Sequence, residues 1–439
     1  MIVDFSFKNF RSFRDETVLS LHADQPKSNL LSNISYPLDD GIGVLRSAVI
    51  YGANASGKSN VLLAVRALRW IIIESDSFKE DRKIPCYEPF LFSDEHKDAP
   101  VEFEIEFIIP GDRRYIYAVS FNRHEVLSES LDFYPSRQRA NIFTRKPGDT
   151  WETISFGGHY KGGMKKIPFF KNNLYLSKAG NNAAAPSMIR KVYKYFRSIL
   201  VWGLNNEVSL SDIYELDGAL ELTASFLRHI DTGVSKITRE DMDFSPVNFP
   251  DGIPSEIREQ IIKENRYNFM FHHDTGEGSS VALEKDEESE GTQQLFKMLP
   301  VMLSSLKMGS TLLIDELENS FHPHIAELLI KIFNCPELNK NDAQLIFTTH
   351  NLELMSPGLM RRDQIWFTKK SGGASKLYSL DEFDKSTVTP SSPYGAWYAE
   401  GRFGAIPSID FEKISKELIE RLNLNESVKN NSTGDEEEE

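Results

Sequence analysis

The stretch Gly52-Ala53-Asn54-Ala55-Ser56-Gly57-Lys58-Ser59 fits the pattern G-x-x-x-x-G-K-[ST]. Directly before it, residues 48–51 form an apolar run of the kind that ends a buried strand at a glycine-rich turn. Directly after it, apolar residues recur through 60–75 with the spacing of a helix that packs on a sheet. A strand, a glycine loop and a helix in this order predict a phosphate-binding loop in an α/β domain.

The residue types in this loop suit a nucleoside triphosphate. Glycines let successive backbone N–H groups face phosphates, and the start of the following helix adds a favourable partial charge. Lys58 is long enough to reach the β- and γ-phosphates, and Ser59 can give an oxygen ligand to Mg²⁺. We therefore expect ATP and Mg²⁺ as ligands, although the pattern does not separate ATP from GTP. The expected nucleotide-binding residues are Gly52, Ala53, Asn54, Ala55, Ser56, Gly57, Lys58, Ser59 and Asn60.

Two carboxylates follow the apolar run 311–314. Asp315 can hold the Mg²⁺ shell, and Glu316 can position or deprotonate an attacking water. Alone, such a pair would indicate only a strand end with solvated charges. Together with the glycine loop, it predicts Asp315 as a metal ligand beside Ser59, and Glu316 as a catalytic residue.

A second strand end carries Thr348-Thr349-His350. We expect His350 at the same sheet edge as the carboxylates, near the γ-phosphate, where it would take part in catalysis. The alternative is an ordinary solvated or core histidine.

The segment Ser289-Glu290-Gly291-Thr292-Gln293 precedes an expected helix that starts near Gln294. A serine hydroxyl and a glycine backbone at the start of a helix can contact a phosphate, so Ser289 and Gly291 are candidate nucleotide contacts. Serine and glycine are also ordinary loop and capping residues, which is the alternative interpretation.

Composition limits the classes of protein to be considered. A chain of 439 residues is long for a single core, so we expect a nucleotide-binding domain with an insertion, or two packed lobes. A net charge of −15 argues against a protein that coats nucleic acid. No run approaches the roughly 18 apolar residues of a membrane span, so we expect a cytoplasmic protein without a membrane partner. Cys86 and Cys335 show no metal-ligand spacing and are expected to be buried and reduced.

The segment 153–206 departs from the acidic average because it contains no Asp or Glu. Its basic residues are Lys161, Lys165, Lys166, Lys171, Lys178, Arg190, Lys191, Lys194 and Arg197, and its aromatic residues include Tyr160, Phe169, Phe170, Tyr175, Tyr193 and Phe196. Such a segment can face a nucleic acid or an acidic partner. A solvated helix face is the alternative.

The remaining patterns complete an α/β assignment. Residues 102–107 and 115–121 alternate like paired strands around a turn at 110–112, residues 187–229 have helical spacing, and 241–256 is proline-rich like a linker. Strand character returns at 267–272, and 311–314, 323–333 and 344–348 alternate strand, helix and strand. We expect an N-terminal lobe at 1–152, a mainly helical, partly basic insertion at 153–265, a C-terminal lobe at 266–425 and a disordered acidic tail at 426–439.

The order of these motifs resembles the ABC ATPase heads of the SMC, RecF and OLD group, and most closely the prokaryotic AAA-domain family of types 15 and 21. The segments 9–13, 316–323 and 401–407 look like that family as well. The resemblance implies an ABC-type P-loop ATPase head with an antiparallel β lobe and a helical insertion. The segment at Ser289 departs from the family pattern because it lacks the usual second glycine, and no glutamine loop is assigned.

In heads of this type two copies sandwich ATP, so the resemblance implies a homo-oligomer in which Ser289 and Gly291 complete the site of a second copy. It also implies that Arg11 touches the nucleotide, although a surface role is equally compatible with the sequence.

The family includes ATPases of genome maintenance and of anti-phage defence, such as PARIS-like and abortive-infection systems, which often act beside a separate nuclease or toxin. The leading hypothesis is an ATP-hydrolysing sensor or scaffold that controls such an effector. The alternatives are a DNA-repair ATPase that binds DNA directly and a stand-alone nuclease. The nuclease is disfavoured because no clear pair of acidic metal motifs follows His350.

Overall fold

The computed structural model describes residues 1–24, 30–204, 214, 218–242, 244, 249–250, 252–275, 278–318, 322–407 and 409–431. The chain forms two units, Met1–Ala405 and Ile406–Glu439. Helix α10 (Phe411–Asn431) makes up most of the described part of the second unit. It includes residues 426–431 of the predicted tail, whereas 432–439 lie outside the described residues. No described helix is long and apolar enough to cross a membrane.

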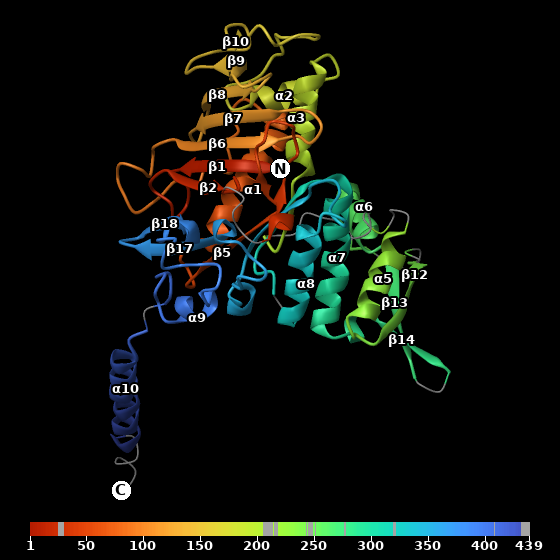
Figure 1. Cartoon of the computed structure of the whole chain (residues 1–439), viewed down its shortest axis with the longest axis vertical. Coiled ribbons are helices and arrows are strands. Elements are labelled where there is room, and N and C mark those ends of the chain that lie inside the picture. The colour runs from red at the N-terminus through yellow and green to blue at the C-terminus, as the bar shows by residue number, and fades with distance from the viewer. Residues whose placement is uncertain are drawn as a thin grey trace. The chain divides into compact units, whose positions relative to one another are not determined.

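The N-terminal part of the first unit is built on a seven-stranded antiparallel sheet (Figure 1). Its strands alternate buried and exposed side chains, as in β6, because one face packs on helices and the other faces solvent. Across the sheet the strands are β10 (Ser155–Phe156), β9 (Ala140–Arg145), β8 (Val126–Phe133), β7 (Arg114–Phe121), β6 (Val101–Ile108), β1 (Ile2–Lys8) and β2 (Thr17–Ser20). The predicted pairing of 102–107 with 115–121 is confirmed by β6 and β7.

A six-stranded sheet carries the glycine loop. Its strands, in spatial order, are β11 (Leu200–Trp202), β15 (Thr311–Ile314), β16 (Gln344–Thr348), β5 (Ser47–Gly52), β17 (Ile365–Ser371) and β18 (Ala374–Ser379). All neighbours are parallel except β17 and β18. The carboxyl ends of β5, β15 and β16 therefore meet at one edge of the sheet.

Both faces of this sheet are buried, which explains the continuous apolar runs of its strands. In β5, Ala48 and Ile50 pack into one core with α1 (Lys58–Glu74), whereas Val49 and Tyr51 point into a second core. The helices that contribute to the second core are α5 (Ala219–His229), α7 (Glu290–Met308), α8 (Pro323–Asn334) and α9 (Tyr394–Ala399). The expected α/β fold with an antiparallel β lobe is confirmed.

The segment 153–265, expected to be mainly helical, contains both helices and strands. Helices α2 (Tyr175–Gly180) and α3 (Ser187–Ser198) pack with α1 in the first core, and β11 enters the parallel sheet. Farther along, β12 (Val234–Asp241) pairs with β13 (Tyr267–Asp274), which also pairs with β14 (Ser280–Glu284). Helix α6 (Ser255–Glu264) precedes β13, and part of the expected linker at 241–256 lies outside the described residues. The four domain boundaries stay a prediction.

Two smaller expectations need adjustment. The aromatic residues of the basic segment are mostly core residues, because Tyr160, Tyr175, Tyr193 and Phe196 are buried. Cys86 and Cys335 are free thiols, but both are half-buried rather than fully buried.

The side chain of Gln344 connects the two large sheets. It is completely buried on β16, and its Oε1 accepts the backbone N–H of Ile2 at 2.8 Å. Its Nε2 donates to the carbonyl oxygens of Ile2 and Leu45, each at 2.9 Å. Leu45 belongs to β4 (Val44–Leu45), which pairs with β3 (Ile34–Ser35). One amide therefore satisfies three polar backbone groups on two strands, β1 and β4, at the junction of the sheets.

We predict that Gln344→Leu destabilises the protein by about 3 kcal/mol or more, because a buried polar group left without a partner costs about 1–3 kcal/mol. Denaturant unfolding followed by circular dichroism measures the change. The matched control is Gln138→Leu in the exposed turn after β8, which should change the free energy of unfolding by less than about 0.5 kcal/mol. Equal stability of the two variants would contradict the proposed connection.

Candidate nucleotide-binding site

The predicted glycine loop connects the end of β5 to the start of α1. Gly57 is the N-cap of α1 with a φ of 112°, and a Cβ there would lie 2.7 Å from Ser375 Oγ. A Cβ on Gly52 would lie 2.4 Å from Thr368 Oγ1. Both positions therefore require glycine, and the backbone N–H groups at the start of α1 have no side-chain cap that would compete with a phosphate.

Side chains from β17 and β18 support the loop from behind. Ser56 Oγ and Thr368 Oγ1 are hydrogen-bonded at 2.6 Å, and Ser375 Oγ donates to the carbonyl of Ser56 at 2.7 Å. Asn54 and Ala55, at the tip, are exposed, and Ala55 has a left-handed φ of 60°. The loop thus has a fixed base and an accessible tip.

Lys58 lies folded back over the loop. Its Nζ donates to the carbonyl oxygens of Gly52 at 2.9 Å and Ala53 at 3.2 Å. Burial lowers the pKa of Lys58, and the charges of Asp315 and Glu316 partly offset this effect. The ammonium group is therefore held inside the loop, with carboxylates nearby.

Asp315 Oδ1 connects the first turn of α1 with the end of β16. It accepts a hydrogen bond from Ser59 Oγ at 3.0 Å and one from Thr348 Oγ1 at 2.6 Å. Ser59 is the second residue of α1, Asp315 directly follows β15, and Thr348 ends β16. Ser59 and Asp315, both predicted as Mg²⁺ ligands, are thus hydrogen-bonded to each other, and a hydroxyl with a carboxylate is a donor set that suits Mg²⁺. Among the described residues there is no cluster of three or more His, Cys, Asp or Glu that would form a metal site without a nucleotide.

Glu316 occupies an unusual backbone conformation at this edge. Its φ is 56°, its side chain is exposed, and its N–H donates to Thr348 Oγ1 at 2.8 Å. A non-glycine residue in the left-handed region is strained, and such strain is common at functional sites. The turn directs the chain away from β15 immediately after Asp315.

His350 follows β16, as expected from the sequence. Its N–H donates to Glu318 Oε1 at 2.6 Å. Partial burial and then the charge of Lys58 lower the pKa of His350, while Glu318, Glu316 and Asp315 act in the opposite direction. The imidazole is therefore neutral near pH 7, a state in which one ring nitrogen can donate and the other can accept.

Asn60 and Arg11 belong to a polar network beside the first turn of α1. Asn60 Nδ2 donates to Ser12 Oγ at 2.8 Å, and Arg11 Nη1 lies 3.4 Å from Asn60 Oδ1. The guanidinium of Arg11 also forms two hydrogen bonds with Glu88, at 2.6 and 3.0 Å. Both side chains are thus oriented by protein groups next to the loop.

Ser289 and Gly291 are not brought to the glycine loop by contacts of this chain. Ser289 is the N-cap of α7, and its Oγ accepts the N–H of Thr292 at 3.2 Å. The preceding Glu288 accepts a 2.5 Å hydrogen bond from His273 Nε2 on β13. Among the described residues, no hydrogen bond or ion pair links Ser289 or Gly291 to residues 52–60. Their capping geometry is what the alternative interpretation predicted.

Sequence reasoning missed the residues that support the site. Thr368 and Ser375 lie on strands that carry no motif, and Glu318 was noted only as part of a longer stretch resembling the family. Their contacts with Ser56 and His350 join residues far apart in the chain. A useful signal would have been the polar residues inside otherwise buried strands, because Thr368 and Ser375 are both buried.

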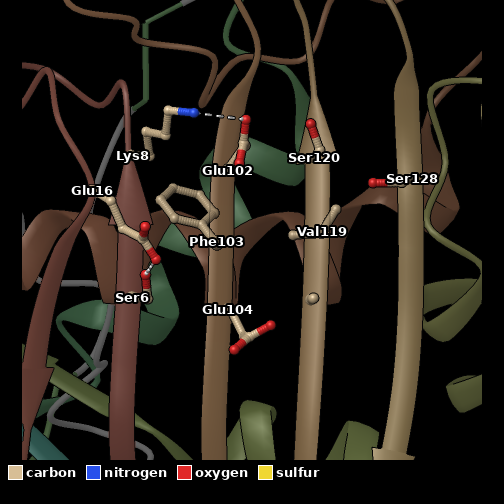
Figure 2. Close-up of a pocket in the computed structure, with 10 residues that line it drawn as sticks. Ser6, Lys8, Glu16, Glu102, Phe103, Glu104, Val119, Ser120 and Ser128 are labelled. Atoms are coloured by element: carbon tan, nitrogen blue, oxygen red, sulfur yellow. Dashed lines mark hydrogen bonds and ion pairs between the residues drawn. The ribbon is translucent and has the colours of Figure 1, made fainter. Parts of the chain in front are cut away.

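A polar hollow on the antiparallel sheet is a separate feature (Figure 2). It is lined by Ser6, Lys8, Glu16, Glu102, Phe103, Glu104, Ala118, Val119, Ser120 and Ser128. In it, Ser6 Oγ donates to Glu16 Oε1 at 3.2 Å, and Lys8 Nζ lies 3.6 Å from Glu102 Oε1. None of the candidate nucleotide-binding residues lines this hollow.

The family comparison agrees with the motif order. Residues 47–356 match the family model described as "AAA domain, putative AbiEii toxin, Type IV TA system". The chain belongs to this AAA-domain family. The matched region contains the glycine loop, Ser289, Asp315, Glu316 and His350. No curated protein sequence matches the chain.

Solved structures resemble this AAA-domain protein at low identity. One is an Smc head bound to the C-terminal winged-helix domain of ScpA, with 13% identity and a TM-score of 0.39, covering 86% of this chain and 97% of that one. Another is the recombination mediator RecF with the nucleotide ATPrS, with 13% identity and a TM-score of 0.36, covering 86% and 98%. RecF with ATP gives 12% identity and a TM-score of 0.36, covering 86% and 97%. At these values the likenesses say nothing about the ligands or partners of this chain.

We predict that Lys58→Ala weakens ATP binding at least about 10-fold, because it removes the ammonium group that the glycine loop holds. Isothermal titration calorimetry with ATP and Mg²⁺ measures the affinity. Lys340→Ala, an exposed lysine before β16, is the control and should bind ATP like the wild type. Normal affinity of Lys58→Ala would contradict the assignment of the loop.

Proposed function

We propose that this AAA-domain protein is an ATP-hydrolysing sensor or scaffold of an anti-phage defence system, which controls a separate nuclease or toxin. The observation that carries the ATPase part is the convergence of Ser59 and Thr348 on one carboxylate oxygen of Asp315, which lies near Lys58. The matched family, whose description includes an AbiEii toxin and a type IV toxin–antitoxin system, supports the defence part.

The residues have distinct proposed roles in hydrolysis. The loop amides and Lys58 bind the phosphates, and Ser59 with Asp315 would hold Mg²⁺, which supplies charge stabilisation to the phosphates. Glu316, exposed beside Asp315, orients and deprotonates the attacking water. His350, neutral near pH 7, contacts the γ-phosphate and stabilises the charge that develops there.

We further propose that ATP brings two copies together. Ser289 and Gly291 of one copy would contact the nucleotide held by the other, so that each site needs both chains. Ser289 and Gly291 start a helix without hydrogen bonds to the glycine loop of their own chain, so a second copy would have to supply them to that loop. An effector that binds only one association state would then be controlled by hydrolysis.

We predict that Glu316→Gln keeps ATP affinity but lowers kcat at least about 100-fold, because the amide cannot take a proton from water. Phosphate release and calorimetry measure the two quantities. Glu353→Gln, an exposed glutamate beyond His350, should leave kcat unchanged. An unchanged kcat of Glu316→Gln would overturn the role of Glu316.

The Glu316→Gln protein, which is expected to bind ATP without hydrolysing it, also tests whether an effector protein binds. Purified from its native host with ATP, it should retain a second protein in a fixed ratio, identified by mass spectrometry, and Lys58→Ala should lose it. Recovery of nucleic acid without a protein partner would overturn the effector proposal and favour the second candidate.

The second candidate is an ATPase that binds nucleic acid directly. It is favoured by the exposed face of α3, where Arg190, Lys191, Lys194 and Arg197 all face solvent while Ile189, Val192 and Phe196 are buried. Within the described chain, Lys191 is the one of these four basic residues that forms an ion pair, in which its Nζ lies 3.5 Å from Asp112 Oδ2. Cations along one helix face suit the phosphates of a nucleic acid backbone.

We predict that, if the second candidate holds, Arg190→Glu/Lys194→Glu weakens binding of a fluorescent DNA duplex at least about 10-fold at low salt, because two phosphate contacts become repulsive. Lys307→Glu/Lys340→Glu carries the same charge change on exposed positions elsewhere and should bind like the wild type. Fluorescence anisotropy at two salt concentrations checks this. Equal binding by both variants would exclude the face of α3 as the interface.

A further inference from the structure

The two chain segments that leave β15 and β16 are joined by successive hydrogen bonds. The N–H of Glu316 donates to Thr348 Oγ1 at 2.8 Å, and the N–H of Leu317 donates to the carbonyl of Thr348 at 3.0 Å. The next bond runs in the opposite direction, because the N–H of His350 donates to Glu318 Oε1 at 2.6 Å. A side chain of the first segment therefore fixes the backbone of the second at His350.

The Glu318 carboxylate uses only one of its two oxygens in a hydrogen bond within the described chain. Oε1 accepts the bond from His350, whereas Oε2 is buried without a hydrogen-bond partner in the described chain. A buried carboxylate oxygen without a partner loses its hydration and gains no compensating bond.

The surroundings connect Glu318 with the nucleotide site. Its charge acts on Lys58 and on His350, and it raises the pKa of both against the effect of burial. It also acts on Tyr51, whose hydroxyl donates to the carbonyl of Asn351 at 3.0 Å. Glu318 thus contacts the segment that carries His350 and lies within electrostatic range of the glycine loop.

We infer that Glu318 is a positioning residue for His350, which it holds at a fixed distance from Glu316 through the hydrogen bond to the His350 backbone. Glu316, with its strained backbone, and His350 lie on the two joined segments. The hydrogen bonds between these segments therefore fix one candidate catalytic group relative to the other. Positioning of this kind affects catalysis because small displacements of a catalytic group lower the rate strongly. The inference rests on the proposed ATPase function.

A double-mutant cycle tests the inference in the full-length protein. Glu318→Ala, His350→Ala and the double variant are compared with the wild type by phosphate release and by ATP calorimetry. Glu318→Ala is expected to lower kcat at least about 10-fold, with ATP affinity within about two-fold of the wild type. The double variant is expected to match His350→Ala alone, because Glu318 has nothing to position once the imidazole is gone.

Two further variants keep the test decisive if alanine impairs folding. Glu318→Gln keeps an oxygen acceptor at the same distance and should retain most of kcat. Glu318→Asp keeps the charge but withdraws the acceptor by one methylene, and it should lower kcat about as much as alanine does. A fully active aspartate variant would overturn the positioning role.

The outcomes separate this inference from the proposed function. If His350→Ala lowers kcat but Glu318→Ala does not, or if the two effects multiply in the double variant, the positioning role is wrong and the ATPase stands. If the wild type shows no ATP turnover, the proposed function itself is wrong.

Discussion

The site depends on one carboxylate oxygen, Oδ1 of Asp315, which accepts hydrogen bonds from two hydroxyl groups, Ser59 in the first turn of α1 and Thr348 at the end of β16. These bonds connect the first turn of α1 with the ends of β15 and β16, at the edge where parallel strands direct their carboxyl ends. The glycine loop, the strained turn at Glu316 and the segment carrying His350 all start from this edge. Any shift between these strands would separate the groups on which the proposed chemistry relies.

The fold keeps these strands in register by burying them completely. Side chains of β5 alternate between two cores, one formed with α1 and the antiparallel sheet, and the other with α7 and α8. A strand packed on both sides cannot slide without exposing apolar surface. The side-chain amide of Gln344 adds hydrogen bonds between the two sheets, to backbone groups that would otherwise remain unpaired.

Local patterns predicted the parts of the fold and site that depend on neighbouring residues. The strand, glycine loop and helix around Lys58 and the strand end at Asp315 lie where the sequence placed them, because each is encoded within a few residues. The three-residue strand β11 was missed because it is too short to show a period, and among the described residues it pairs with β15 alone. The contact of Glu318 with His350 joins residues 32 positions apart, and no local pattern records such a contact. The proposed roles of Ser289 and Gly291 remain predictions.

The left-handed backbone at Glu316 places two demands on one residue. Glycine adopts that conformation with the least strain, yet only a residue with a carboxylate can serve the proposed reaction. Selection for a more stable protein and selection for turnover therefore favour different amino acids at this position. A more stable relative, natural or engineered, that has glycine at this position would be expected to bind the nucleotide without hydrolysing it.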